Sequence, residues 1–177
     1  MKTKDIKTKL KEYFFLNPTI KLRVRQIERE LKVPLPSVIR YTKELEKEGI
    51  LKSTKIANIT TYSADRTSKT FLLEKKLFNI HQLNISGLVD FLIEELSNPT
   101  VIVFGSYAKA EDVENSDIDI YIETPSKKKI NVEKYEKILR RKIQLFIYKN
   151  IHELENKELA NNIINGIILN GFMEVFT

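Results

Sequence analysis

The sequence predicts an α+β protein built from two parts that differ in charge and in hydrophobic pattern. Residues 1–70 hold 17 Lys and Arg against 8 Asp and Glu, whereas residues 71–177 hold 13 against 16. Helical periodicity followed by two strand patterns marks the first part, and strand patterns separated by helical ones mark the second. We therefore expect two domains of different function. The basic balance of the first indicates that it binds a polyanion; the alternative is that its lysines serve only to keep the surface solvated.

Composition excludes several classes of protein. The 177 residues are 42% hydrophobic, which is enough to bury a core. Because cysteine is absent and there are two histidines, a disulfide scaffold, a thiolate site, a cysteine nucleophile and a histidine-rich zinc site are excluded. No apolar run approaches the roughly 20 residues of a membrane span, and no apolar region follows the charged N-terminus. We expect a soluble, cytoplasmic protein with no membrane partner.

Three helices and a hairpin are predicted in the first part. The expected elements are helices over 4–16, 23–31 and about 36–48, then strands over 50–56 and 59–63. In the third helix, Val38, Thr42 and Leu45 share the inner face. Gly49 supplies the left-handed residue that ends this helix.

This order of elements, with the segments 24–31 and 45–51, resembles the winged helix-turn-helix family. The resemblance implies that the third helix enters a DNA major groove while the hairpin lies on phosphates. The DNA-binding residues it indicates are Ser37, Arg40 and Tyr41 on the helix and Lys52 and Lys55 on the hairpin. Winged helices also serve as protein-docking or dimerisation modules. Binding of a protein partner and homodimerisation are therefore alternatives to the binding of double-stranded DNA through residues 1–68.

The predicted domains are a winged helix-turn-helix domain over 1–68, connecting helices over 69–98 and a second domain over 99–177. The connecting segment shows helical periodicity with an interruption near residues 84–86. Ser86 is expected to cap the helix that follows the interruption.

The segment 101–123 carries the chemistry. Its apolar start, residues 101–104, predicts a strand buried on both faces, and Gly105 and Ser106 follow it directly. A glycine and a serine at a strand-to-helix junction offer backbone N–H groups and a hydroxyl that suit a phosphate. A Gly-Ser pair alone is a weak signal, because most such pairs only form turns.

A second strand pattern, residues 116–122, places Asp117 and Asp119 on one face. Two like charges at that spacing are costly unless a cation neutralises them, and aspartate is a poor strand former. Oxygen ligands indicate Mg²⁺ or Mn²⁺ as the ion. The alternative is an exposed strand edge with two solvated acids.

A family resemblance is carried by two short motifs, Phe104-Gly105-Ser106 and, after ten further residues, Asp117-Ile118-Asp119. Together they resemble the signature of the polymerase-β-like nucleotidyltransferase superfamily. The resemblance is strongest to its small prokaryotic members, the minimal nucleotidyltransferases. The resemblance covers about residues 88–150. It implies a mixed sheet flanked by helices and a nucleoside-triphosphate site in which Gly105, Ser106 and Ser116 bind nucleotide. Asp117 and Asp119 are then the catalytic residues and the metal ligands.

One position departs from that family. Its members usually carry a third carboxylate on a later strand, and the matching position here is Gln144, whose amide cannot take a proton. Glu123 lies on the same strand face as the aspartates but roughly 13 Å along the strand, which is too far for it to replace a carboxylate at Gln144. Ala110 stands where many relatives carry a glycine.

Two functions follow from these residues. The first is transfer of a nucleotidyl group, with AMP as the expected group, from a Mg²⁺-bound nucleoside triphosphate to a hydroxyl on a protein, such as a HEPN-type partner, or on RNA. The alternative is a catalytically impaired, nucleotide-sensing or partner-docking regulator that binds DNA. The final segment, 159–176, is expected to place apolar residues on one helical face for core packing.

Overall fold

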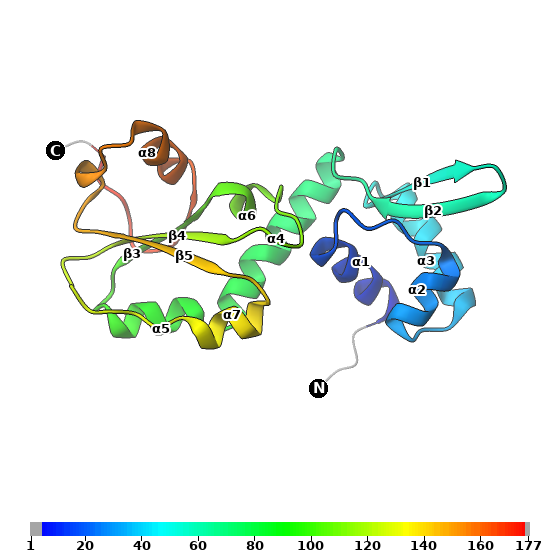
Figure 1. The fold of residues 1–177 in the computed structure, drawn as a ribbon, viewed down its shortest axis with the longest axis horizontal. Helices are drawn as coiled ribbons and strands as arrows, with labels where there is room; N and C mark the ends of the chain where they lie inside the picture. Colours follow the sequence, from blue (N-terminus) through cyan, green and yellow to red (C-terminus); the bar gives the residue numbers. More distant parts are fainter. Residues whose placement is uncertain (1–4, 176–177) are drawn as a thin grey trace. The chain divides into compact units, whose positions relative to one another are not determined.

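A computed structural model describes residues 5–175. The chain divides into two compact units, 1–78 and 79–177, and the boundary falls within helix α4 (Lys69–Ile85) (Figure 1). This boundary lies inside the segment 69–98 that the sequence predicts as connecting helices. None of the helices in the described part of the chain is long and apolar enough to cross a membrane.

The first unit contains the helices and the hairpin in the predicted order. Its elements are α1 (Ile6–Leu16), α2 (Val24–Leu31), α3 (Leu35–Lys47), β1 (Leu51–Ile56) and β2 (Ile59–Ala64), followed by the first part of α4. The two strands form an antiparallel ribbon in which Leu51 pairs with Ala64 and Ile56 with Ile59. The identity of this unit as a winged helix-turn-helix domain stays a prediction.

Helix α3 ends as its sequence predicts. The N–H of Gly49 donates to Glu46 O and that of Ile50 to Leu45 O at 2.8 Å, which is the Schellman pattern, and Gly49 has a φ of +74°. Val38, Thr42 and Leu45 are fully buried in the core of this unit. The predicted inner face of α3 is therefore confirmed.

The second unit is a four-stranded mixed sheet with helices on both faces. Its further elements are α5 (Leu88–Glu95), β3 (Thr100–Phe104), α6 (Gly105–Lys109), β4 (Ile118–Glu123), α7 (Glu133–Leu139), β5 (Ile143–Tyr148), a short 3-10 helix (Ile151–Glu153), α8 (Lys157–Ile164) and β6 (Ile167–Asn170). The strand order is β5-β4-β3-β6. Strand β3 is antiparallel to both its neighbours, whereas β4 and β5 are parallel.

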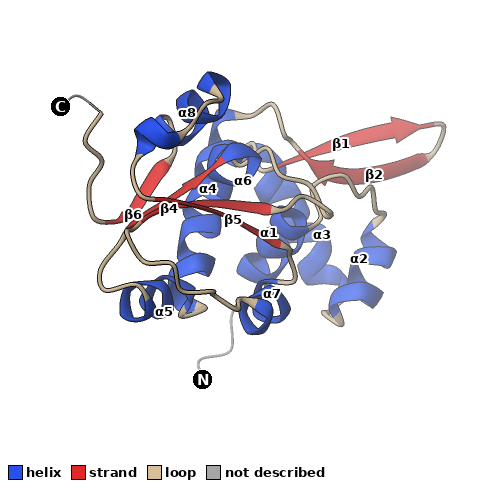
Figure 2. Cartoon of the chain, turned by 60° about the vertical axis from the view of Figure 1, so that its left-hand side comes forward, coloured by secondary structure: helices blue, strands red, loops and turns tan. Residues whose placement is uncertain are grey.

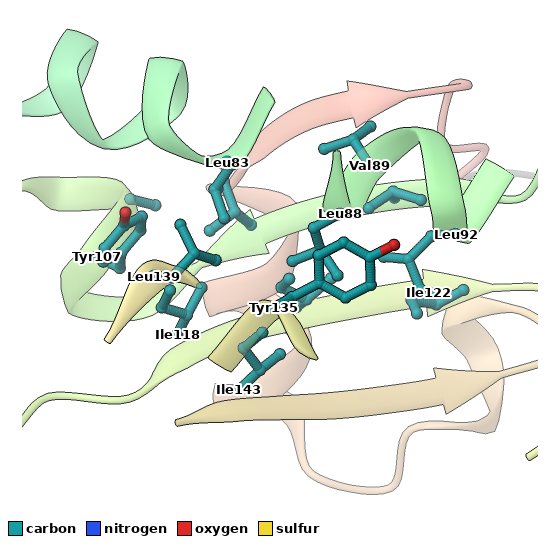
Figure 3. Close-up of a cluster of buried hydrophobic side chains, with 14 of the residues drawn as sticks. Leu83, Leu88, Val89, Leu92, Tyr107, Ile118, Ile122, Tyr135, Leu139 and Ile143 are labelled. Atoms are coloured by element: carbon teal, nitrogen blue, oxygen red, sulfur yellow. The ribbon is translucent and has the colours of Figure 1, made fainter. Parts of the chain in front are cut away.

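Each face of this sheet packs its own core. Val103, Ile120 and Ile122 point to the face covered by α5 and α7, where they join Leu92 and Tyr135 (Figure 3). The alternate residues of β3 and β4, among them Ile102, Phe104 and Tyr121, pack on the opposite face with Ile163 of α8. Figure 2 shows α8 and the α5–α7 pair on opposite sides of the strands. The prediction that residues 101–104 form a strand buried on both faces is thus confirmed.

Two local expectations are wrong. The residue that caps α5 is Gly87, with a φ of +77°, although the Ser86 hydroxyl does accept the Leu88 N–H at 3.2 Å. The final segment is not helical throughout, because β6 pairs with β3 after Gly166. A Cβ on Gly166 would lie 2.6 Å from Ile102 Cγ2, so this glycine lets the chain approach β3 closely enough to form the strand.

Candidate functional site

Asp117 and Asp119 lie at the beginning of β4. The strand starts at Ile118, two residues later than the sequence pattern predicts, so Asp117 is the last loop residue and Asp119 the second residue of the strand. Both side chains are half-buried. Burial and, after it, the negative charge of Asp117 raise the pKa of Asp119 above that of an ordinary aspartate. A cation bound between the two carboxylates would relieve the charge repulsion.

Gln144 occupies the position that the sequence assigns to it. In the parallel pairing of β4 with β5, Asp119 is in register with Gln144, and on the other side it is in register with Phe104 of β3. The Gln144 amide nitrogen donates to Asp117 Oδ2 at 2.6 Å. The third position of the site is therefore an amide that contacts the aspartate pair directly.

Gly105 forms the wall of the site opposite Asp119. It has a φ of +71°, and a Cβ at this position would overlap Asp119 Oδ2. The backbone consequently comes close to the carboxylate only because residue 105 is glycine. Ser106 follows it, and no hydrogen bond among the described residues occupies its hydroxyl.

The loop before Asp117 is anchored by a buried polar network that the sequence did not predict as a unit. Asp112 is 1% exposed and accepts hydrogen bonds from Asn79 at 2.9 Å and from the Arg141 guanidinium at 3.4 Å. Arg141 also donates to the carbonyl of Val113, and the Ser116 hydroxyl accepts the Val113 N–H at 2.9 Å. These contacts fix the loop from which Asp117 emerges, and they use the Ser116 hydroxyl within that loop.

The sequence analysis singled out two further residues near the site, Ala110 as a replacement for glycine and Glu123 as a carboxylate too distant to replace one at Gln144. Ala110 has a φ of +61°, a left-handed conformation in which glycine is the usual residue. Glu123 is in register with Thr100 and Tyr148 at the far end of β4, and its carboxylate accepts the Tyr121 hydroxyl at 2.8 Å. It therefore does not replace a carboxylate at Gln144.

A basic cavity of about 400 Å³ lies where α7 leads into β5. Four bases and two acids line it, and one acid, Glu136, pairs with Lys142 at 2.9 Å; the lining residues are Lys137, Arg140, Arg141, Lys142, Glu133 and Glu136. The Lys142 carbonyl accepts the Ile118 N–H, which places this cavity beside the start of β4. The cavity therefore adjoins the end of the sheet at which the two aspartates lie.

The donor atoms of the site fit Mg²⁺ or Mn²⁺ held jointly with a phosphate ligand. Among residues 5–175, no three side chains of the His, Cys, Asp and Glu types converge on one point, so the protein does not form a complete metal cage there. Two carboxylates and an amide supply oxygen atoms. Mg²⁺ typically binds through one or two carboxylates, with water and substrate phosphates completing its shell.

The predicted DNA-binding residues lie on two elements of the first unit. On α3, the Arg40 guanidinium lies 4.2 Å above the ring of Tyr41 and 3.7 Å from Glu44. Ser37 is half-buried on the same helix. Lys52 and Lys55 lie on β1, where their spacing of three residues directs them to opposite faces of the ribbon, and Lys52 is 3.9 Å from Asp65.

No curated protein matches this chain. Residues 85–169 match the family model described as "Nucleotidyltransferase domain". The matched segment runs from the end of α4 to β6 and includes Gly105, both aspartates and Gln144. The second unit is accordingly similar to nucleotidyltransferase domains, and this similarity supports nucleotidyl transfer as its general chemistry.

Proposed function

We propose that the second unit binds a nucleoside triphosphate with Mg²⁺ or Mn²⁺ at Asp117 and Asp119 and transfers its nucleotidyl group, AMP being the one we expect, to a hydroxyl. The acceptor is a protein or an RNA. The observation that carries the proposal is the pair of half-buried carboxylates at one sheet end, one of which, Asp119, lies directly against the backbone of Gly105.

Each residue of the site has a role in this reaction. Asp117 and Asp119 hold the metal, which, when bound, neutralises charge on the α-phosphate. The backbone at Gly105 and the free hydroxyl of Ser106 bind the triphosphate, and we keep Ser116 as a weaker candidate because its hydroxyl is already used in the loop. The acceptor oxygen forms a bond to the α-phosphorus while the bond to the β-phosphate oxygen breaks and pyrophosphate leaves.

A second function is favoured by Gln144. The proton of the acceptor hydroxyl must pass to a carboxylate or to water, because an amide cannot take it. The Gln144 amide instead donates to Asp117. A site with that residue binds metal and nucleotide but transfers slowly or not at all, as expected of a nucleotide-sensing or partner-docking regulator.

For the first unit we propose nucleic-acid binding by a winged helix-turn-helix fold, with double-stranded DNA as the partner and Ser37, Arg40, Tyr41, Lys52 and Lys55 as the residues indicated by sequence. The order of helices and hairpin and the basic balance of residues 1–70 support this proposal. Docking of a protein partner and homodimerisation are the alternatives for this unit.

Label transfer from α-phosphate-labelled ATP, CTP, GTP and UTP tests the reaction. The wild type is compared with Asp117→Asn/Asp119→Asn, and with Asp90→Asn/Glu155→Gln, which removes two exposed acids elsewhere in the same unit. We expect the first pair to reduce transfer by about 100-fold or more and the second to leave it unchanged. Equal transfer by the wild type and Asp117→Asn/Asp119→Asn would contradict the site.

The same assay with Gln144→Asp separates the two functions. Transfer by the wild type supports the enzyme. Nucleotide binding without transfer in the wild type, together with transfer in Gln144→Asp, supports the regulator and identifies residue 144 as its cause. Absence of metal-dependent nucleotide binding in calorimetry would contradict both.

A further inference from the structure

A groove in the first unit, between α2 and the tip of the β1–β2 hairpin, is lined by three arginines. Arg23, Arg25 and Arg29 come from α2 and the residue before it, and Asn58 and Thr60 come from the hairpin. Its volume is about 650 Å³. We call this feature the arginine groove. None of the residues that the sequence indicates for DNA binding belongs to it.

The arginine groove is positively charged without compensation. No Asp or Glu is among its lining residues, and no ion pair within residues 5–175 joins Arg23, Arg25 or Arg29 to an acid. Arg25 and Arg29 are four residues apart on the same face of α2, where like charges repel each other. An anion in the groove would remove that repulsion.

The outer face of α3, which the sequence indicates for DNA, differs in charge. Along α3 the bases Arg40, Lys43 and Lys47 are interspersed with Glu44 and Glu46, and the Arg40 guanidinium lies 3.7 Å from the Glu44 carboxylate. An arginine that is paired with a glutamate attracts a phosphate backbone less than arginines that have no acid beside them, as in the arginine groove.

The shape and chemistry of the groove fit a sugar–phosphate chain. A guanidinium donates in a planar fork that matches two phosphate oxygens. Arg25 and Arg29 start about 6 Å apart along the helix axis, which spans more than one phosphate of a strand that carries one charge per about 3.4 Å. Asn58 and Thr60 add uncharged hydrogen-bonding groups, and Val24 adds an apolar contact surface.

We propose that the arginine groove, rather than the outer face of α3, is the surface of this protein that binds the phosphodiester backbone of a nucleic acid. The proposal rests on the proposed nucleic-acid binding of the first unit and changes its location. Because backbone contacts carry no sequence information, binding there is strongly salt-dependent and weakly sequence-dependent.

Fluorescence anisotropy of the full chain with a labelled 20-base-pair DNA duplex, and with a single-stranded RNA of the same length, tests the location across a range of salt concentrations. Arg25→Gln/Arg29→Gln is compared with Lys43→Gln/Lys47→Gln, which removes the same charge from exposed positions of α3. We expect the arginine pair to weaken binding at least tenfold and to lower the salt slope by about 1.8, or 0.9 for each lost phosphate contact. The lysine pair should weaken binding less than threefold. Circular dichroism verifies that both variants are folded.

The outcomes separate the proposal from the function on which it rests. If the wild type binds neither probe, nucleic-acid binding by the first unit is wrong, and the groove proposal with it. If the wild type binds but the lysine pair loses as much affinity as the arginine pair, or more, only the location is wrong. Preferential loss in the arginine pair supports the groove, and the stronger of the two probes identifies DNA or RNA as the source of the backbone.

Discussion

Two acidic regions of the second unit, Asp112 in the loop before β4 and the pair Asp117 and Asp119 where β4 begins, differ in how their charge is balanced. Asp112 is buried against Arg141 and Asn79, with contacts of 3.4 Å and 2.9 Å. Asp117 and Asp119 are half-buried beside each other, and no ion pair in the described chain joins either of them to a base. The pKa of Asp119 is raised accordingly, first by burial and then by Asp117.

The difference separates Asp112, whose carboxylate stabilises the fold, from Asp117 and Asp119, which we propose bind a metal ion. A buried charge is tolerated when a partner and hydrogen bonds satisfy it, as they do at Asp112. Uncompensated like charges at the start of a strand oppose folding, and proteins retain such arrangements mainly where function requires them. The contacts of Asp112 also fix the loop that leads to Asp117 and Asp119.

The largest loss of stability should come from breaking the ion pair between Asp112 and Arg141. Arg141→Met leaves the Asp112 carboxylate buried without its guanidinium, so we expect the second unit to lose about 3 kcal/mol of unfolding free energy. The melting temperature of this unit, residues 79–177, should fall by roughly 12–24 °C, because a domain of that size shifts by about 4–8 °C per kcal/mol. Chemical denaturation and calorimetry measure both. Arg140→Met, which removes an exposed neighbour, is the control, and an equal loss in that variant would show that the buried pair is not the anchor.

An intermediate effect should come from the glycine that faces the aspartates. Gly105→Ala and Gly87→Ala both place alanine at a φ above +70°, which costs roughly 1–2 kcal/mol. Only at Gly105 does the new methyl overlap Asp119, whereas at Gly87 nothing lies within 4 Å.

We therefore expect Gly105→Ala to be the less stable of the two and to lose the rise in melting temperature that Mg²⁺ with ATP gives the wild type. Gly87→Ala should keep that rise. Thermal denaturation with and without Mg²⁺-ATP measures it, and a rise retained in Gly105→Ala would place the nucleotide elsewhere.

The smallest change in stability should come from removing the charge of Asp119, which no base compensates in the described chain. Since the pKa of Asp119 is raised on folding, its ionisation opposes folding, and the penalty is complete above the raised pKa and absent below the unfolded value near 3.8. Asp119→Asn should thus raise the melting temperature at pH 7 by up to about 2 °C, and the gain should vanish as the pH falls toward 3.8. Thermal denaturation as a function of pH measures it. A melting temperature lowered at pH 7 would mean that the carboxylate makes a stabilising contact.

Local patterns in the sequence were enough to predict most of the helices and strands and to single out the candidate site residues. Periodicity predicted the helices of the first unit, because a buried face of 3.6-residue repeat is a property of the segment alone. Alternation predicted β4, and the resemblance to the nucleotidyltransferase superfamily matched Gln144 to the third position of the site; the register of β4 with β5 places it beside Asp119. The ends of elements were less certain, as the late start of β4 at Ile118 shows.

Only the tertiary structure decided which distant charges meet. The pairing of Asp112 with Arg141 joins residues 29 positions apart, and the arginine groove joins α2 to a hairpin tip about 30 positions later. The conversion of the last apolar segment into β6 likewise required the edge of β3 as its partner. Periodicity shows which side of a segment is buried. Whether a charged side chain is paired depends on the side chain that packs against it in the folded protein. That neighbour lies elsewhere in the chain, so the local pattern does not reveal it.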